Sequence, residues 1–173
     1  MLSDNGGCSE TPDTTPNIPP GPVESYRAIG PPWANASNTP YRKYKSSDYE
    51  GGNHTPFIAH WPAVIKPGQI TDQVGHIIDI LPTFMEIADA AYPDEIEGRK
   101  LKRPVGKSLL PIFNGDIRKP HDVLYWQFGQ AKAVREGDWK LVKFGDADWE
   151  LYDLAADRTE LDNLAEKHPD RVR

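Results

Sequence analysis

The sequence has 173 residues, of which 38% are hydrophobic, and carries 20 Lys and Arg against 26 Asp and Glu, a net charge of −6. This acidic balance, with no basic run, excludes a non-specific nucleic-acid binder and a polybasic membrane contact. No apolar stretch approaches the roughly 18 residues of a membrane-spanning helix, and the single cysteine excludes an intrachain disulfide. The length allows one domain, or slightly more, with a modest core.

The first ten residues contain the stretch Ser3-Asp4-Asn5-Gly6-Gly7. Asp4 and Asn5 offer hard oxygen ligands, and adjacent glycines let the backbone approach a bound group closely, so the stretch predicts a site for a divalent cation or an anion. The same residues are typical of an ordinary Asx turn, and both interpretations stay open at this point. Cys8 has Glu10 beside it and no histidine within the next forty residues, so we interpret it as unreactive.

Residues 8–40 are rich in proline. This density predicts a long loop without regular elements, of the kind that forms a wall or lid beside a site. The prolines are Pro12, Pro16, Pro19, Pro20, Pro22, Pro31, Pro32 and Pro40.

Three elements are predicted between residues 55 and 118. Residues 55–62 form a short apolar run between prolines, which favours a buried strand, and residues 74–79 suit a second extended piece. Residues 80–90 predict a helix, because Pro82 stands in a first turn and apolar residues recur at helical spacing. Residues 94–118 follow as a charged connector that holds one apolar cluster.

The composition changes after residue 118. The runs 123–128, 131–135, 139–144 and 149–154 predict three or four short antiparallel strands, and we interpret their tryptophans as an aromatic core rather than a carbohydrate platform. Thr159 and Asp162 have capping-box spacing before apolar residues, which predicts a helix that ends at His168-Pro169.

Lys45 precedes the glycine pair Gly51-Gly52. Taken alone, it is a solvated lysine on a polar surface. Together with Asp4 and Asn5, its ammonium group suits the binding of a tetrahedral oxyanion, for which sulfate and phosphate esters are the natural candidates.

The order of these motifs resembles the C-terminal part of a sulfatase of the arylsulfatase type, within the alkaline-phosphatase-like superfamily. The matching segments lie at both ends of the chain and in its middle. They are Ser3-Asp4-Asn5-Gly6, Lys45 through Glu50-Gly51-Gly52, Pro56 to Pro62, Asp79-Ile80-Leu81-Pro82-Thr83, Arg135 to Leu141, and Glu150 to Leu154 continuing through Asp157, Glu160 and Asn163-Leu164.

The resemblance implies an α/β fold. Residues 1–118 would be the C-terminal portion of the catalytic domain, with segments of its sheet and the Pro-rich loop 8–40. Residues 119–173 would form a small α+β subdomain with a three- to four-stranded antiparallel sheet. Because only Leu2 stands before the first motif, we expect the chain to be a piece of a larger enzyme, whose N-terminal half is its partner.

The resemblance also implies a sulfuric ester hydrolase that acts on aryl or sugar sulfate esters. Asp4 and Asn5 would be two of four side chains that hold Ca²⁺ or Mg²⁺, and Lys45 would contact the sulfate group. The family's nucleophile is a formylglycine made from Cys or Ser in a C/S-x-P-x-R motif, which the residues from Cys8 to Pro12 do not match. We therefore expect the nucleophile outside this chain and no activity from the chain alone.

Asn53-His54 stand where the family usually has smaller or aliphatic residues. We predict that His54 lines the substrate entrance, and the alternative is a surface histidine; the other four histidines we interpret as structural or exposed. Two further functions stay open, a phosphate or phosphonate ester hydrolase on the same scaffold and a non-catalytic structural or binding module. Export to a periplasm, a lysosome or the exterior is common in the family, although these residues contain no targeting sequence.

Overall fold

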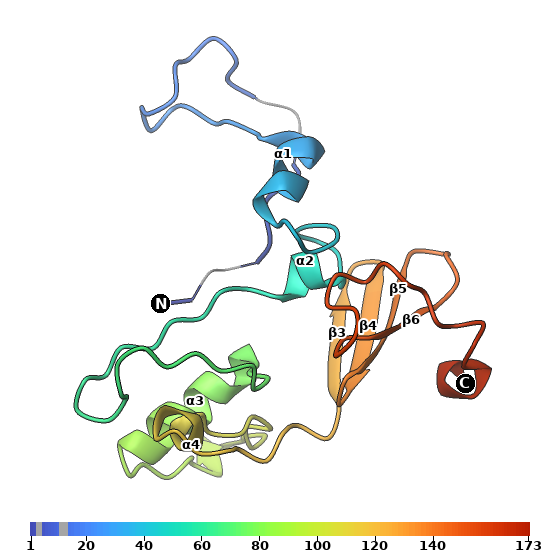
Figure 1. Cartoon of the computed structure of the whole chain (residues 1–173). Helices are drawn as coiled ribbons and strands as arrows, with labels where there is room; N and C mark the ends of the chain where they lie inside the picture. Colours follow the sequence, from blue (N-terminus) through green and yellow to red (C-terminus); the bar gives the residue numbers. More distant parts are fainter. Residues whose placement is uncertain (3–4, 11–13) are drawn as a thin grey trace. The chain divides into compact units, whose positions relative to one another are not determined.

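The computed structural model describes residues 1–2, 5–10 and 14–173 (Figure 1). The chain forms two compact units: Met1–Ile58 together with Asp122–Arg173, and Ala59–His121. The predicted domain boundary at residue 118 concerns the domains of a larger enzyme and stays a prediction. Among the described residues, no helix is both long enough and apolar enough to cross a bilayer.

A four-stranded antiparallel sheet forms the C-terminal half of the first unit. Its strands are β3 (Leu124–Phe128), β4 (Ala131–Glu136), β5 (Trp139–Phe144) and β6 (Glu150–Asp153), and they lie in chain order as a meander. Gly129 and Gly137 stand in the tight connections on either side of β4 with φ of +56° and +59°, a conformation that favours glycine. The predicted antiparallel sheet is confirmed.

The core of this unit joins the sheet to the segment around residue 49. Tyr49, Ala133, Val142, Tyr152 and Leu154 are buried together, and Trp126 packs against them, as expected for an aromatic core residue. The segment that follows Lys45 is therefore held directly against the sheet.

The N-terminal part of the first unit contains two short helices, α1 (Gly30–Ser37) and α2 (Glu50–Asn53). The prediction that residues 8–40 hold no regular element is wrong at α1. Pro31 and Pro32 begin this helix, where the missing N–H groups would have no intrahelical partner in any case.

The strand predicted at residues 55–62 is also wrong. Within the described residues, the run makes only an isolated antiparallel bridge, between Phe57 and Leu2, with reciprocal backbone bonds between Met1 and Ile58. Pro56 and Pro62 cannot donate to a strand ladder, so pairing is confined to a few residues.

The second unit contains η1 (Ile77–Asp79), α3 (Ile80–Ile87), the hairpin of β1 (Glu95–Ile96) and β2 (Arg99–Lys100), and α4 (Leu110–Phe113). The helix predicted from residue 80 is confirmed as α3. The prediction that residues 74–79 are extended is wrong for residues 77–79, which form η1. Thr83 Oγ1 accepts a hydrogen bond from the Leu109 amide at 2.8 Å and links α3 to the chain entering α4.

Asp79 organises the second unit from a fully buried position. Its Oδ1 accepts from the Lys107 amide and from His121 Nε2, both at 2.8 Å, and its Oδ2 accepts from the His76 amide at 2.9 Å and from Arg118 Nη1 at 3.0 Å. Burial alone would raise the pKa of Asp79, but these donors lower it. His76 and His121 are therefore structural, as predicted.

The helix predicted after Thr159 is absent from the structure, which describes all of residues 159–168. The Asp157 carboxylate accepts hydrogen bonds from the amides of Leu161 and Asp162, at 2.6 and 2.8 Å, and the chain forms turns instead. Side chains of this type compete with helix formation because they offer backbone N–H groups another partner. A short helix, α5 (Pro169–Val172), ends the chain.

Candidate active site

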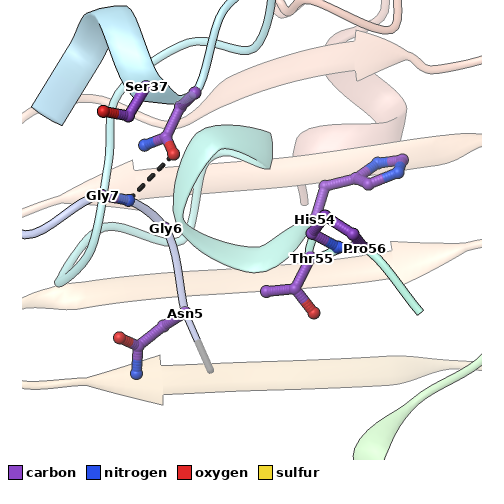
Figure 2. Close-up of a pocket in the computed structure, with 8 residues that line it drawn as sticks. Asn5, Gly6, Gly7, Ser37, His54, Thr55 and Pro56 are labelled. Carbon is purple, nitrogen blue, oxygen red and sulfur yellow. Dashed lines mark hydrogen bonds between the residues drawn. The ribbon is translucent and has the colours of Figure 1, made fainter. Parts of the chain in front are cut away.

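Backbone contacts bring the N-terminal motif to the Lys45 segment. The Gly7 amide donates to Asn38 Oδ1 at 2.8 Å (Figure 2), and the Gly7 carbonyl accepts from the Lys45 amide at 3.2 Å. Asn38 Nδ2 donates to the Lys43 carbonyl at 3.1 Å, so one side chain holds both segments.

Glycines allow these segments to touch. A Cβ atom on Gly6 would lie 1.9 Å from the Gly51 carbonyl oxygen, and one on Gly51 would lie 2.2 Å from the Lys43 carbonyl oxygen. A Cβ atom on Gly7 would lie 2.7 Å from the Ala34 carbonyl oxygen. The motif therefore packs backbone to backbone against α1 and α2, at distances that only glycine permits.

A pocket of about 270 Å³ lies where these segments meet, and Figure 2 shows its lining. It is lined by Asn5, Gly6, Gly7, Ser37, Asn38, His54, Thr55 and Pro56. The structure thus brings together Asn5 and His54, which the sequence nominates as a metal ligand and a substrate contact. Asp4, the other nominated metal ligand, lies outside the described residues.

Asn5 is exposed, and within the described part of the chain its carboxamide has no hydrogen-bond partner. A free carboxamide oxygen next to a carboxylate in the sequence is a donor set that suits Ca²⁺ or Mg²⁺. The described residues contain no cluster of three or more His, Cys, Asp or Glu side chains that could hold a metal ion.

Lys45 is engaged by the Pro-rich segment. Its Nζ lies 3.0 Å from Glu10 Oε1, while the Tyr26 hydroxyl donates to Glu10 Oε2 at 3.1 Å. The hydrogen bond from Lys45, followed by that from Tyr26, lowers the pKa of Glu10. The Lys45 backbone joins the N-terminal motif, but Lys45 is not among the residues that line the pocket.

His54 stands at the pocket with its side chain 42% exposed. Its Nδ1 lies 3.0 Å from Glu50 Oε2, and its ring stacks on Tyr41 with centroids 4.3 Å apart. In Figure 2 the imidazole points away from Asn5, while the His54 backbone and Thr55 face the pocket. Glu50 and Tyr41 therefore set the direction of this ring.

Sequence reasoning missed a buried cluster behind α2. Lys140 Nζ lies 2.7 Å from Glu50 Oε1 and 2.9 Å from Glu160 Oε1, and Glu160 Oε2 accepts from the Glu50 amide at 2.7 Å. Burial alone would raise the pKa of Glu50, but His54 and Lys140 lower it to about 2. The sequence held one sign of this cluster: Lys140 lies two positions before Val142 in β5, so both residues share the buried face of the strand.

A second link ties the same segment to β6. Arg42 Nη1 donates to Glu150 Oε2 at 2.9 Å, to the Tyr152 hydroxyl at 2.6 Å and to the Glu160 carbonyl at 3.1 Å. Tyr49 donates to the other carboxylate oxygen of Glu150 at 2.8 Å. Residues 42–50 are therefore anchored to the C-terminal sheet at several points.

Comparison with known proteins agrees with this arrangement. Residues 43–171 match the family described as N-sulphoglucosamine sulphohydrolase, C-terminal. The chain belongs to the sulfatase family. The match covers both the Lys45 segment and the C-terminal sheet, which are the two parts that the buried cluster joins.

The relatives of this sulfatase chain are longer than it is. A sulfatase of Schizosaccharomyces pombe is 38% identical over 157 residues, which are 87% of this chain and 28% of the relative. The N-acetylglucosamine-6-O-sulfatase of Bacteroides thetaiotaomicron is 29% identical over 130 residues, or 67% of this chain and 22% of the relative. The chain thus spans about a quarter of the length of these relatives.

A solved structure confirms the fold of the sulfatase chain. It comes from work on the metabolism of multiple glycosaminoglycans by Bacteroides thetaiotaomicron and superposes with a TM-score of 0.61 at 28% identity, over 77% of this chain and 30% of the other. The α/β fold of alkaline-phosphatase-like sulfatases, with an antiparallel C-terminal sheet, is therefore the fold of these residues.

Proposed function

We propose that the protein carrying these residues hydrolyses sulfate esters and that the pocket beside Asn5 belongs to its active site. Water is consumed, the bond between sulfur and the ester oxygen breaks, and an alcohol and inorganic sulfate are released. The observation that carries this proposal is the backbone contact of the N-terminal motif with two later residues, Gly6 with Gly51 and Gly7 with Lys45. These contacts hold the Asn5 and Lys45 segments next to each other, and a metal ion and an ammonium group can each neutralise charge on the oxygens of a tetrahedral anion.

Asp4 and Asn5 would hold a Ca²⁺ or Mg²⁺ ion together with ligands from residues outside this chain. The exposed Asn5 carboxamide at the pocket, which has no partner among the described residues, supports this role. When bound, the ion supplies positive charge that polarises the sulfate oxygens. The nucleophile, a formylglycine in this family, would also come from outside these residues.

Lys45 would donate from its ammonium group to the sulfate and offset charge on the departing oxygen. Glu10, one partner of Lys45, is exposed, and solvent screens an exposed ion pair, so a sulfate group can take the place of this carboxylate. His54 would contact the substrate at the pocket entrance.

The substrate would be an aryl or sugar sulfate. The relative named N-acetylglucosamine-6-O-sulfatase favours a sulfated sugar. An open pocket with hydrogen-bonding side chains such as Ser37 and Thr55 suits the hydroxyl groups of a sugar.

The test is turnover by the intact enzyme and by its Asn5→Ala and Lys45→Ala variants, with an aryl sulfate, a 6-sulfated amino sugar and an aryl phosphate as substrates. We expect sulfate ester hydrolysis, a loss of kcat/KM on the order of 100-fold or more in each variant, and an unchanged unfolding midpoint because both side chains lie near the surface. Lys66→Ala, at an exposed lysine, is the control.

Two results would contradict the proposal. Hydrolysis of the phosphate ester in preference to the sulfate ester would favour phosphoester chemistry on the same scaffold. Full activity of both variants would show that neither side chain acts in the reaction.

A further inference from the structure

Lys140 is a fully buried cation in the middle of a sheet, between the carboxylates of Glu50 and Glu160. We infer that Lys140 is a positioning residue for the sulfatase site, because it fixes α2 and, through α2, both Gly6 and His54. This inference rests on the proposed function, since it assigns Lys140 a part in the same reaction without contact to the substrate.

The sheet fixes the Lys140 ammonium group. Lys140 lies on β5 and is paired with Arg135 of β4 on one side and Tyr152 of β6 on the other. Its backbone is therefore held by a strand ladder on both sides, and the Nζ position is set by a rigid element rather than by a loop.

Glu50 is held at two points by this cluster. Its side chain meets the Lys140 ammonium group at 2.7 Å, and its amide, at the first position of α2, donates to Glu160 Oε2 at 2.7 Å. Glu160 itself has φ of +57°, which L-residues seldom adopt, and its carbonyl accepts from Arg42. Several contacts thus hold Glu160 in a strained conformation in which it can reach α2.

The position of α2 determines two features of the pocket, because α2 contacts both Gly6 and His54. The Gly51 carbonyl lies against Gly6, next to Asn5, and no side chain separates them. Glu50 Oε2 lies 3.0 Å from His54 Nδ1 and sets the ring direction at the pocket. Any displacement of Glu50 therefore shifts both sides of the pocket.

Stability alone does not account for a lysine at this position. A buried ion pair is seldom more stabilising than apolar residues of similar volume, because desolvation offsets the attraction between the charges. An apolar residue beside Val142 on the same face of β5 would fill the core, but it would not fix the orientation of a carboxylate. The chemistry of the cluster therefore favours geometric control of α2.

The test compares Lys140→Met, Lys140→Arg and the double variant Lys140→Met with Glu50→Gln in the intact enzyme. Lys132→Met, at an exposed lysine on β4, is the matched control. At a temperature where all variants are folded, we expect Lys140→Met to lower kcat about 10- to 100-fold with little change in KM, because small displacements of a site cost this much. We expect Lys140→Arg to retain more activity and Lys132→Met to retain all of it.

The double variant separates positioning from stability. It removes the charge of Glu50 and leaves Glu160 as the one carboxylate of the cluster without Lys140, so the unfolding midpoint should recover part of the way toward the wild-type value, whereas kcat should stay low because α2 is no longer tied to β5. Recovery of kcat together with the midpoint, or an unchanged kcat in folded Lys140→Met, would overturn the inference.

Hydrogen exchange gives a readout that does not depend on turnover. In Lys140→Met we expect faster exchange in peptides covering residues 42–53, where amides donate to the carbonyls of Arg42 and Gly7. Exchange in peptides covering β3 and β4 should stay unchanged. An equal increase of the exchange rate in both regions would overturn the inference that Lys140 positions α2. If the wild-type enzyme cleaves no sulfate ester, the proposed function fails, and this exchange pattern still decides whether Lys140 positions α2.

Discussion

Space, rather than backbone angle, requires glycine at position 6. Its missing Cβ atom would lie 1.9 Å from the Gly51 carbonyl oxygen and 2.9 Å from Asn38 Nδ2, so any side chain would push the motif away from α2. The position of Asn5 at the pocket depends on this contact. Replacing Gly6 with alanine, which adds one methyl group, therefore tests whether the motif must touch α2.

We expect Gly6→Ala to lower the free energy of unfolding by about 1–3 kcal/mol, the usual cost of overpacking, and to reduce the kcat/KM of the intact enzyme for sulfate esters. Chemical denaturation and steady-state kinetics measure the two effects. Gly75→Ala is the control, because its Cβ would meet only Leu109 Cδ2 at an ordinary 3.6 Å. Equal stability of Gly6→Ala and wild type would mean that α2 is not held where the structure has it.

The pocket residues differ in how far sequence could predict them. Asn5 and His54 stand in local motifs, and the structure places both at the same pocket. The pairing of Lys45 with Glu10 and of Glu50 with Lys140 joins residues 35 and 90 positions apart, and no local pattern specifies such partners. The individual charges were visible in the sequence, but their pairing depended on the tertiary fold.

At the scale of elements, Asp79 joins η1 and α3 to two later segments of the second unit. It stands at the end of η1, where it accepts the His76 amide, and it also accepts donors from Lys107, Arg118 and His121. All four donors face a carboxylate that solvent does not reach. The folded conformation of residues 76–121 therefore depends on the negative charge of Asp79.

We expect Asp79→Asn to lower the free energy of unfolding by about 3–5 kcal/mol at pH 7, because an amide cannot accept from all four donors and leaves the buried Arg118 without a carboxylate partner. The pKa of Asp79 is lowered in the fold, so its contribution is complete above the ordinary value of 3.8 and is lost as the pH falls below it.

Urea unfolding at pH 7 and pH 3 measures this prediction, and the two proteins should differ less at the lower pH. Glu86→Gln, at an exposed carboxylate on α3, should show little change at either pH. A difference between wild type and Asp79→Asn that grows in acid would contradict the assigned role.

Elements with a strong local signal were predicted correctly. The wrong predictions overlooked either the lack of a pairing strand or a competing side-chain hydrogen bond. The strands β3 to β6 come from short runs that are rich in aromatic and aliphatic residues, with Gly129 and Gly137 in the turns on either side of β4. The run 55–62 is as apolar as a strand, but a strand also needs a neighbouring chain to pair with. After Thr159, the Asp157 carboxylate takes the amides that a first helical turn would leave free, and this competition is not visible in apolar spacing.

At the scale of the whole molecule, both ends of the chain build the unit that holds the pocket. Met1–Ile58 supplies the pocket residues, and Asp122–Arg173 supplies the sheet that anchors them. The family match from residue 43 to residue 171 includes the sheet and, from the pocket lining, His54, Thr55 and Pro56. The sequence motifs placed these two parts on either side of a boundary at residue 118, and the structure adds the contacts that join them into one unit.

We expect the purified 173-residue chain to show no sulfatase turnover, because it contains no C/S-x-P-x-R motif for the nucleophile and offers only part of a metal ligand set. An aryl sulfate assay at high protein concentration measures this, with the intact enzyme as the positive control. Hydrolysis above the background rate by the isolated chain would place a nucleophile within these residues.

The long separation between the partners of α2 also fixes an order of events during synthesis. The Glu50 side chain finds Lys140 90 positions later, and its amide finds Glu160 110 positions later. Contacts of such high sequence separation form late, because the intervening loop must close first. A ribosome must therefore translate past codon 160, and the nascent segment must leave the exit tunnel, before the pocket around Asn5 can take its final shape.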